Sequence, residues 1–505
     1  MDELFEQTGK ISGARWLGWL WPRGAGMGRA ARATLGAHRA CAVTAFVAAT
    51  AFTWIATCGS WQPAYPDVFG AFYDFQALSL LEGRLDVPPE AIGDEAFIYA
   101  GKTYGYFGVT PALLRLPFVL FGVAFGELTR ASMIVGYVGA LVAAYLLLVE
   151  ACRRLRPDEP RPSAWAAILL TANVGLGSTM LFLGSRAYLY HEAILWGVTL
   201  ALFACWCALR HLAAPAGRWW LGALACGVLS VHARPPTGLF ALTFLGGVAL
   251  ALAGRARRAQ LRALRPVVLG ALCVAGVLSF NALSYLKFGT WDGCPLRLNV
   301  QYDAARLAHV DGKPFHLSNL RFTIYTYVLR PNLGVQRNFP WLFLNRSKPG
   351  PNFPEAKTDF ADRTLGIPYS MTGLFLLATA GGALAWRRVP AARLPVALTW
   401  LTAVPMALAM FTAIATTQRY TGDFCPFLIC AAAFGLAGLE LVAPPWRRLC
   451  RGVALAATVW SLALTAAITL HYQGEIIWGV PDGVEENYRN LRDRVDDFFG
   501  QPHRR

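Results

Sequence analysis

The fold is decided by residues 67–86, Asp67-Val-Phe-Gly-Ala-Phe-Tyr-Asp-Phe-Gln-Ala-Leu-Ser-Leu-Leu-Glu-Gly-Arg-Leu-Asp86, a polar stretch directly after the first long apolar run. Its apolar residues recur at helical spacing as far as Gly83, which predicts an amphipathic helix over 68–82. Asp67 and Asp74 are nearly two helical turns apart, so one helix containing both would project both carboxylates from the same face.

Apolar blocks of membrane-crossing length recur along the whole chain. Its 505 residues are 55% hydrophobic and 15% charged, whereas a soluble protein of this size has about a quarter charged residues. Because a helical crossing needs roughly 20 apolar residues, the pattern predicts an all-α polytopic membrane protein with about 11 transmembrane helices. The expected spans are 41–58, 130–150, 164–184, 189–209, 218–233, 236–253, 267–287, 367–386, 394–415, 424–442 and 451–471.

The basic residues are distributed as topology determinants. The net charge is +16, yet the arginines lie in short connectors between apolar blocks, which argues against a nucleic-acid partner. Half of the 46 lysines and arginines fall in segments expected on one side, namely 1–40, 151–163, 210–218, 254–266, 387–394 and 443–452. The opposite loop, 59–110, has two basic and seven acidic residues. The positive-inside rule therefore places the N-terminus in the cytoplasm.

This topology predicts three parts. They are a cytoplasmic basic N-terminus (1–40), a transmembrane domain (41–471) and an external C-terminal tail (472–505). Two large external loops, 59–129 and 288–366, belong to the transmembrane domain, and both are expected to contain helices at the membrane surface. The expected setting is a bacterial-type inner or plasma membrane.

The first external loop has two further predicted elements. Residues 111–126 are apolar but short for a crossing and contain Arg115 and Pro117, so we expect an interfacial helix with Thr110 as its cap. Residues 95–108 alternate in polarity and predict a small hairpin that turns at Ala100-Gly101.

Each early carboxylate has two interpretations. Asp67 is either a helix N-cap or a catalytic general base. Asp74 is either a solvated loop charge or that base. A site at the membrane surface favours a base because partial desolvation raises the pKa of a carboxylic acid toward neutrality.

These residues carry a resemblance to a known family. One span, a long external loop with an early Asp, an amphipathic helix ending Leu80-Leu-Glu-Gly-Arg-Leu85, and an apolar outer helix resemble the GT-C superfamily of integral-membrane glycosyltransferases. The resemblance covers about residues 41–290 and is nearest to the polyprenyl-phosphate-sugar branch, which includes protein O-mannosyltransferases and aminoarabinose lipid A transferases. It implies an Asp base after the first span, with Asp67 the better match and Asp74 second. It also implies a lipid-phosphate sugar donor and transfer with inversion on the outside.

Candidate substrate-binding residues occur near the expected outer ends of several spans. Tyr73 and Gln76 flank Asp74. His191 and Glu192 open the fourth span and either pair with each other or orient a substrate, since ionisable groups at membrane depth are functional candidates.

Two arginines are candidates for binding an anion. Arg234 follows the fifth span and either extends to the interface or holds a lipid phosphate, as a basic residue often does in GT-C relatives. Arg419 either pairs with Asp423 or clamps a phosphate, with Tyr420 stacking on sugar or prenyl chain. The loop 288–366 has ten basic and six acidic residues with many aromatics. Such a surface suits anionic lipid headgroups, a lipid-linked donor or an anionic glycan.

The resulting hypothesis is an inverting cell-envelope glycosyltransferase that uses Asp67 or Asp74 as base. The expected partners are a lipid-linked sugar donor, a glycan, lipid or protein acceptor, and the membrane. No cofactor or metal-ligand set is predicted, although a divalent ion stays undecided. The alternative is a lipid or solute transporter, which should show two related halves with broken helices at the midplane. The sequence has no such symmetry, and its ionisable residues gather toward the outer ends of the spans.

Overall fold

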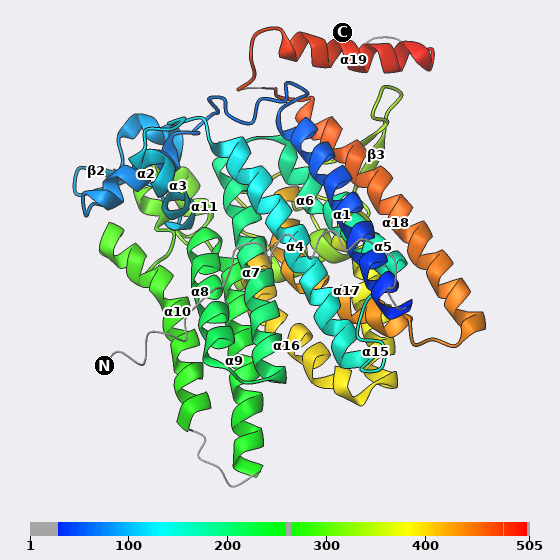
Figure 1. Ribbon diagram of the computed structural model, residues 1–505. Helices are drawn as coiled ribbons and strands as arrows, with labels where there is room; N and C mark the ends of the chain where they lie inside the picture. Colours follow the sequence, from blue (N-terminus) through cyan, green and yellow to red (C-terminus); the bar gives the residue numbers. More distant parts are fainter. Residues whose placement is uncertain (1–28, 259–263, 478, 502–505) are drawn as a thin grey trace, which may run out of the picture.

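The computed structural model describes residues 29–258, 264–477 and 479–501, which form a bundle of long helices with one elaborated end (Figure 1). The predicted N-terminal segment 1–40 lies outside the described residues up to residue 28, as do residues 502–505 of the predicted tail. The long helices are α1 (Arg29–Ala56), α4 (Thr129–Leu155), α7 (Leu189–Ala213), α8 (Gly217–Ala233), α9 (Pro235–Arg258), α10 (Leu264–Phe288), α16 (Pro390–Thr412), α17 (Cys425–Leu439) and α18 (Pro444–Gln473).

Eight helices of the described chain are long and apolar enough to cross a membrane. The pair α5 (Ala164–Gly175) and α6 (Thr179–Phe182), the latter continued by η5 (Leu183–Ser185), bends by 41° and makes a ninth if counted as one span. The other two predicted spans are also helical, but α8 has 17 residues, and residues 367–388 form a broken series. That series comprises α13 (Ile367–Ser370), α14 (Thr372–Leu376), η9 (Leu377–Gly381) and α15 (Gly382–Arg388). The chain is thus an integral membrane protein, mostly helical and polytopic.

Helix α17 is the centre of the bundle. Its residues are apolar around the whole circumference and all of them are buried, as expected for a helix enclosed by others. Small residues let its neighbours approach closely. A Cβ atom on Gly435 would lie 1.9 Å from the carbonyl oxygen of Leu377 and 3.0 Å from the backbone of Gly381. The close approach of η9 to α17 therefore requires glycine at position 435.

The segments 57–128, 289–366, 474–477 and 479–501 gather at one end of the bundle, which we call the loop end (Figure 1). The predicted helix is confirmed as α2 (Phe72–Leu81), which ends before Gly83 with a φ of +70°. It is not amphipathic as predicted, because it buries Asp74, Gln76 and Ser79 and exposes Leu78 and Leu81. The predicted hairpin is confirmed as β1 (Phe97–Tyr99) paired with β2 (Lys102–Tyr104). The chain that follows β2 is tied to the bundle by Lys287 of α10, whose ammonium donates to the carbonyls of Gly105 and Phe107 at 3.0 and 2.6 Å.

Two details of the first loop differ from prediction. Helix α2 begins at Phe72 with Ala71 at its N-cap, so Asp67 lies outside the helix, is not its cap and does not share a helical face with Asp74. Helix α3 spans Thr110–Leu120 and is capped by Val109 rather than Thr110. Eleven residues are too few for a crossing. Its C-terminal residues Leu120 and Phe121 are 63% and 83% exposed, as suits a helix lying at an interface.

The second loop and the C-terminal segment complete the loop end. They contain α11 (Ala304–His309), α12 (Leu320–Ile324), η8 (Tyr325–Leu329), the antiparallel pair β3 (Leu333–Val335) and β4 (Leu342–Leu344), and β5 (Phe360–Ala361) parallel to β6 (Ala415–Thr416). The 3-10 helix η10 (Gln418–Phe424) leads directly into α17. After α18, α19 (Val484–Phe498) lies across the loop end, above the tops of α1 and α18 (Figure 1).

Candidate active site

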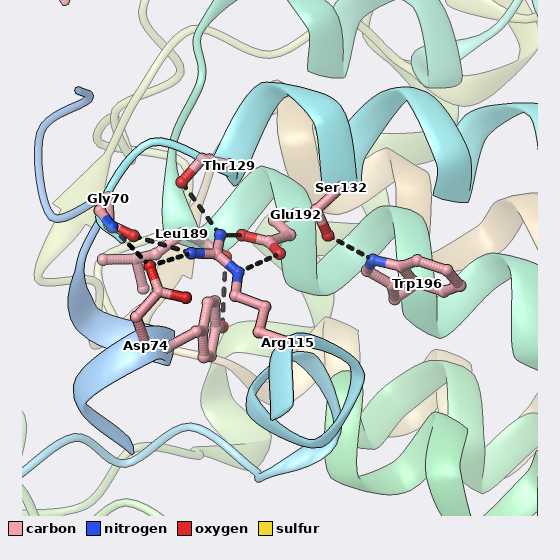
Figure 2. Close-up of polar contacts among 10 residues, drawn as sticks. Gly70, Asp74, Arg115, Thr129, Ser132, Leu189, Glu192 and Trp196 are labelled. Atoms are coloured by element: carbon pink, nitrogen blue, oxygen red, sulfur yellow. Dashed lines mark hydrogen bonds and ion pairs between the residues drawn. The ribbon is translucent and has the colours of Figure 1, made fainter. Parts of the chain in front are cut away.

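Asp74 belongs to a buried ion triplet centred on Arg115 (Figure 2). The guanidinium of Arg115 donates to Asp74 Oδ2 at 3.1 Å and to Glu192 Oε2 at 2.6 Å. All three side chains are at most 2% exposed. The triplet joins α2, α3 and α7, and so ties the first loop to the bundle.

The remaining donors of Arg115 are also used. They reach the carbonyl of Gly70 at 2.9 Å and the hydroxyl of Thr129 at 3.0 Å, while Asp74 Oδ2 also accepts from the backbone N–H of Gly126 at 2.8 Å. A buried charge is tolerated only when it is paired and hydrogen-bonded. These contacts satisfy that need for Arg115, and they leave Asp74 committed to a structural bond on one oxygen.

Asp67 has a separate and simpler environment. Its Oδ1 accepts from Arg130 Nη2 at 2.7 Å, and both side chains are at most 1% exposed. Its Oδ2 is buried without a hydrogen-bond partner. Burial raises the pKa of Asp67 to about 7, against the opposing effect of the Arg130 charge. A carboxyl group of this kind changes protonation state at neutral pH, as a general base must.

The two carboxylate environments lie side by side. Thr129, which accepts from Arg115, is followed by Arg130, which binds Asp67. The charges of Arg115 and Glu192 also act on Asp67. The first turn of α4 therefore organises a single buried cluster that holds three carboxylates and two guanidiniums.

A small hollow opens beside Arg130. It is lined by Ala56, Cys58, Arg130, Ser185, Arg186, Ala187, Ile476 and Ile477. Several polar atoms around it are buried without a hydrogen-bond partner, including Nε and Nη1 of Arg130 and the hydroxyl of Ser185. Unsatisfied buried donors are uncommon in native proteins and mark places where a ligand or water binds.

Arg234 and Asp423 form a second buried pair. The guanidinium binds the carboxylate in bidentate fashion, with N–O distances of 2.8 and 2.6 Å. Arg234 also lies 4.9 Å from the ring centroid of Tyr420. Asp423 is thus the partner of Arg234 and not of Arg419, which corrects the self-paired interpretation of the segment 418–423. Arg234 likewise does not extend to the interface as a free charge.

Arg419 consequently has no acidic partner within the described residues. Its guanidinium carbon lies 4.8 Å from the ring centroid of Tyr190 and 5.5 Å from that of Tyr420, and its Nε is buried without a hydrogen bond. Arg186 is close enough for the two positive charges to repel each other. Arg186 itself stacks on Tyr472, 3.8 Å from the ring centroid. Two arginines set among tyrosines form a surface suited to an anion that carries an apolar or sugar group.

The other predicted residues are distributed around these clusters. His191 and Glu192 do not pair: His191 Nδ1 lies 2.9 Å from the carbonyl of Leu183, whereas Glu192 binds Arg115. Tyr73 is buried and donates to the carbonyl of Leu189 at 3.3 Å. Both amide atoms of Gln76 are buried without a partner.

Sequence reasoning missed Arg130 and Arg186 and did not assign Arg115 to the site. From the sequence, Arg115 argues only against a membrane crossing by residues 111–126, and Arg130 is only the first residue of the predicted span 130–150. The available signal was the presence of an arginine within or beside an apolar run, since such residues are rare unless they are paired inside the protein. Their partners are as many as 349 residues away, which no local pattern reveals.

The described residues contain no group of three or more His, Cys, Asp and Glu side chains able to hold a metal ion. Each carboxylate of the buried cluster is bound by a guanidinium, while Asp67 Oδ2 and Asp74 Oδ1 have no hydrogen-bond partner.

Comparison with known proteins gives only distant likeness. No family model matches the sequence, and neither does any curated protein. The chain is similar in structure to the apo form of an oligosaccharyltransferase from Archaeoglobus fulgidus, with 13% identity and a TM-score of 0.45. It is also similar to the archaeal oligosaccharyltransferase AglB from the same organism in complex with an inhibitory peptide and a dolichol-phosphate, with 13% identity and a TM-score of 0.46. Each alignment covers 92% of this chain but 60% of the other.

Proposed function

We propose that the protein is a membrane glycosyltransferase of GT-C type that moves a sugar from a polyprenyl-phosphate donor to an acceptor hydroxyl, with inversion and with Asp67 as general base. The observation that carries the proposal is the state of Asp67. Its carboxyl group is buried, has a pKa of about 7, and keeps one oxygen unpaired at the edge of the Arg130 cluster. A base in that state accepts a proton at neutral pH and is shielded from bulk water.

Asp74 is the less suitable base, although the sequence leaves both open. Its Oδ1 is buried without a hydrogen-bond partner, as is Oδ2 of Asp67. The two residues differ in that Asp74 Oδ2 accepts from both Arg115 and the backbone N–H of Gly126 within the ion triplet, whereas Asp67 accepts from Arg130 alone. The role of Asp74 in the proposal is to fix Arg115 and Glu192, and through Thr129 the start of α4.

The chemical step follows from these roles. Asp67 Oδ2 takes the proton of the acceptor hydroxyl as the oxygen attacks the anomeric carbon of the donor. The bond between that carbon and the phosphate oxygen breaks, and its electron pair leaves with the lipid phosphate. Because attack comes from the face opposite the phosphate, the anomeric configuration inverts.

The departing phosphate needs positive charge, and Arg419 supplies it. Arg419 has a buried unpaired N–H, and no ion pair with an acid is found for it within the described residues. Preorganised donors of this kind stabilise charge that develops in a transition state. Tyr190 and Tyr420 hold the guanidinium plane. Arg234 is neutralised by its ion pair with Asp423, and it contacts Tyr420 beside Arg419.

The proposal places the loop end outside the membrane and the N-terminus in the cytoplasm, because the basic connectors of the sequence lie at the opposite end. The broader class of lipid-linked donor is favoured by the pairing of cationic and aromatic side chains around Arg419. The transfer assay described next determines which sugar is moved and which acceptor receives it.

The deciding experiment is a transfer assay in proteoliposomes with radiolabelled polyprenyl-phosphate sugars and a crude envelope acceptor fraction. Asp67→Asn should lower turnover about 10²–10⁴-fold, the usual contribution of a general base. Asp86→Asn, which changes a carboxylate in an exposed ion pair of the same loop, is the matched control and should keep full activity. Transfer that survives Asp67→Asn would refute the mechanism. Donor movement across the bilayer without transfer would support the transporter instead.

A further inference from the structure

The segment between α18 and α19 covers Asp67 and Arg130. Ile476 and Ile477 line the hollow beside Arg130, and the carbonyl oxygen of Gly479 accepts a hydrogen bond from Arg130 Nη2, the same nitrogen that binds Asp67. We call the described residues 474–477 and 479–483 the roof segment. It has no helix or strand, and Ile476 is 45% exposed on its outer side.

Contact between the roof segment and the carboxylate is as close as a backbone allows. A Cβ atom at Gly479 would lie 2.6 Å from Asp67 Oδ1 and 3.3 Å from Arg130 Nη2. The φ of Gly479 is +60°, a conformation that favours glycine. Position 479 thus allows the chain to fill the space directly over Asp67, where a bound molecule would otherwise lie.

The roof segment is fixed at both of its ends. Glu475 forms an ion pair with Arg363 of the second loop. Beyond the roof, the hydroxyl of Tyr488 in α19 donates to Gln473 at 2.9 Å. Further along α19, the carboxylate of Asp496 accepts from the backbone N–H of Phe339 at 2.6 Å and from the Asn338 side chain at 3.0 Å. The irregular stretch is thus held by only a few polar contacts. Regions with so few contacts can open locally while the rest of the protein stays folded.

We propose that the roof segment is a displaceable gate over the acceptor position, and that the structure holds it closed, with the Gly479 carbonyl standing in for an oxygen of the acceptor. When the roof lifts, the freed Nη2 hydrogen of Arg130 and the unpaired Oδ2 of Asp67 receive an acceptor that offers a hydroxyl beside a second oxygen. The acceptor therefore enters from the loop end, on the side that the roof segment covers. The catalytic part of this inference rests on the proposed function, whereas the motion itself does not.

Cys58 reports the motion independently of enzymatic activity, because it lines the same hollow. The full-length protein in nanodiscs is treated with a maleimide reagent, and peptide mass spectrometry measures the labelling rate of Cys58 alone. Gly479→Ala, which sets a methyl group against Asp67, should label several-fold faster than the natural protein. Asp496→Ala, which loosens α19, should do the same. Glu486→Ala, which changes an exposed residue in the first turn of α19, should leave the rate unchanged.

A reversible lock tests the catalytic role. Ile476→Cys and Ile477→Cys each place a thiol on the wall that faces Cys58. Oxidation should cross-link at least one of them to Cys58 and abolish sugar transfer, and a reductant should restore it. In each variant combined with Cys58→Ser, oxidation should have no effect.

Three outcomes overturn the gate. They are unchanged Cys58 labelling in both loosened variants, failure of both cysteine variants to cross-link, and full transfer by cross-linked protein. If Asp67→Asn is inactive but Cys58 labelling is unchanged in Gly479→Ala and Asp496→Ala, the proposed function stands and the gate does not. Faster labelling in the loosened variants with an active Asp67→Asn would leave the gate standing without the base.

Discussion

Arg115 and Glu192 form an ion pair 2.6 Å long between residues 77 positions apart, and both side chains are almost fully buried. Arg115 comes from a short helix at the loop end and Glu192 from the first turn of a membrane-crossing helix. Together with Asp74 they join the first loop to the bundle, and that junction sets the position of Asp67.

Loss of Arg115 should destabilise the protein strongly. Arg115→Ala leaves Asp74 and Glu192 buried without their partner, and breaking a buried pair in this way costs about 3–5 kcal/mol. Thermal unfolding in detergent, followed by tryptophan fluorescence, should show a large fall in Tm. Arg84→Ala removes a cation from exposed ion pairs with Glu82 and Asp86 and should change stability by less than about 1 kcal/mol. Equal effects of the two substitutions would contradict the buried triplet.

The pH dependence of activity should report Asp67. Its pKa of about 7 means that the base form is depleted below neutrality, so turnover should rise with pH through about 7 and then level off. Arg130 favours the ionised carboxylate, so Arg130→Gln should move the midpoint to higher pH. A profile that is flat between pH 5.5 and 8.5 would argue against Asp67 as the base.

Stability should respond to pH with the opposite sign. The folded protein holds a proton on Asp67 up to about pH 7, far above the ordinary value of 3.8, so ionisation of Asp67 opposes folding. Its contribution to stability falls as pH rises from about 4 to 7 and is constant above that range. Asp67→Asn, an isosteric amide, should remove this slope. Calorimetry of both proteins between pH 4 and 8 measures the difference, and identical slopes would contradict the raised pKa.

Arg419 should act on the donor. Arg419→Ala removes an unneutralised guanidinium, and one hydrogen bond to a charged group is worth about 1.5–3 kcal/mol, so kcat/KM for the lipid-linked sugar should fall by about tenfold or more. Arg419→Lys keeps the charge without the planar geometry and should recover part of the loss. Arg337, an exposed arginine of the same end, provides the matched control as Arg337→Ala. An unchanged kcat/KM in Arg419→Ala would rule out its role in binding the phosphate.

Arg234 and Asp423 should behave as a coupled pair. Asp423→Ala leaves a buried guanidinium without its carboxylate and should cost several kcal/mol, about as much as other broken buried pairs. The double variant Arg234→Met and Asp423→Ala removes both charges and should regain much of that stability. A double-mutant cycle on Tm measures the coupling, and simple additivity of the two effects would contradict the bidentate contact.

The sequence predicts the regular parts of the fold well. Helical periodicity and a terminal glycine identify α2, and alternation around Ala100-Gly101 identifies the hairpin, since both signals are local. The length criterion finds the long spans but not how α8 and residues 367–388 depart from a straight crossing. In residues 367–388 the broken series packs closely against Gly435 and Gly438 of α17, a tertiary contact that a single segment does not encode.

The site is predicted only in part. Charge and position select Asp67, Asp74, Arg234 and Arg419, but partner choice depends on contacts between distant helices. Asp423 lies four residues after Arg419, the spacing of an intrahelical pair, yet it binds Arg234 from a different helix junction. His191 and Glu192 are neighbours in sequence that turn to different partners. The pairing of buried charges is a tertiary property.

The complete enclosure of α17 has a consequence for how this protein can diversify. Arg419 and Asp423 lie in η10, which leads directly into α17. Because α17 is packed tightly on all sides, these two residues cannot shift without disturbing the core. In the proposed mechanism, recognition of the donor phosphate is therefore tied to the least adaptable part of the molecule. Substitutions in the irregular chain around Ile476 and in α19 do not alter that part, so under the same proposal acceptor preference can change through surface substitutions alone.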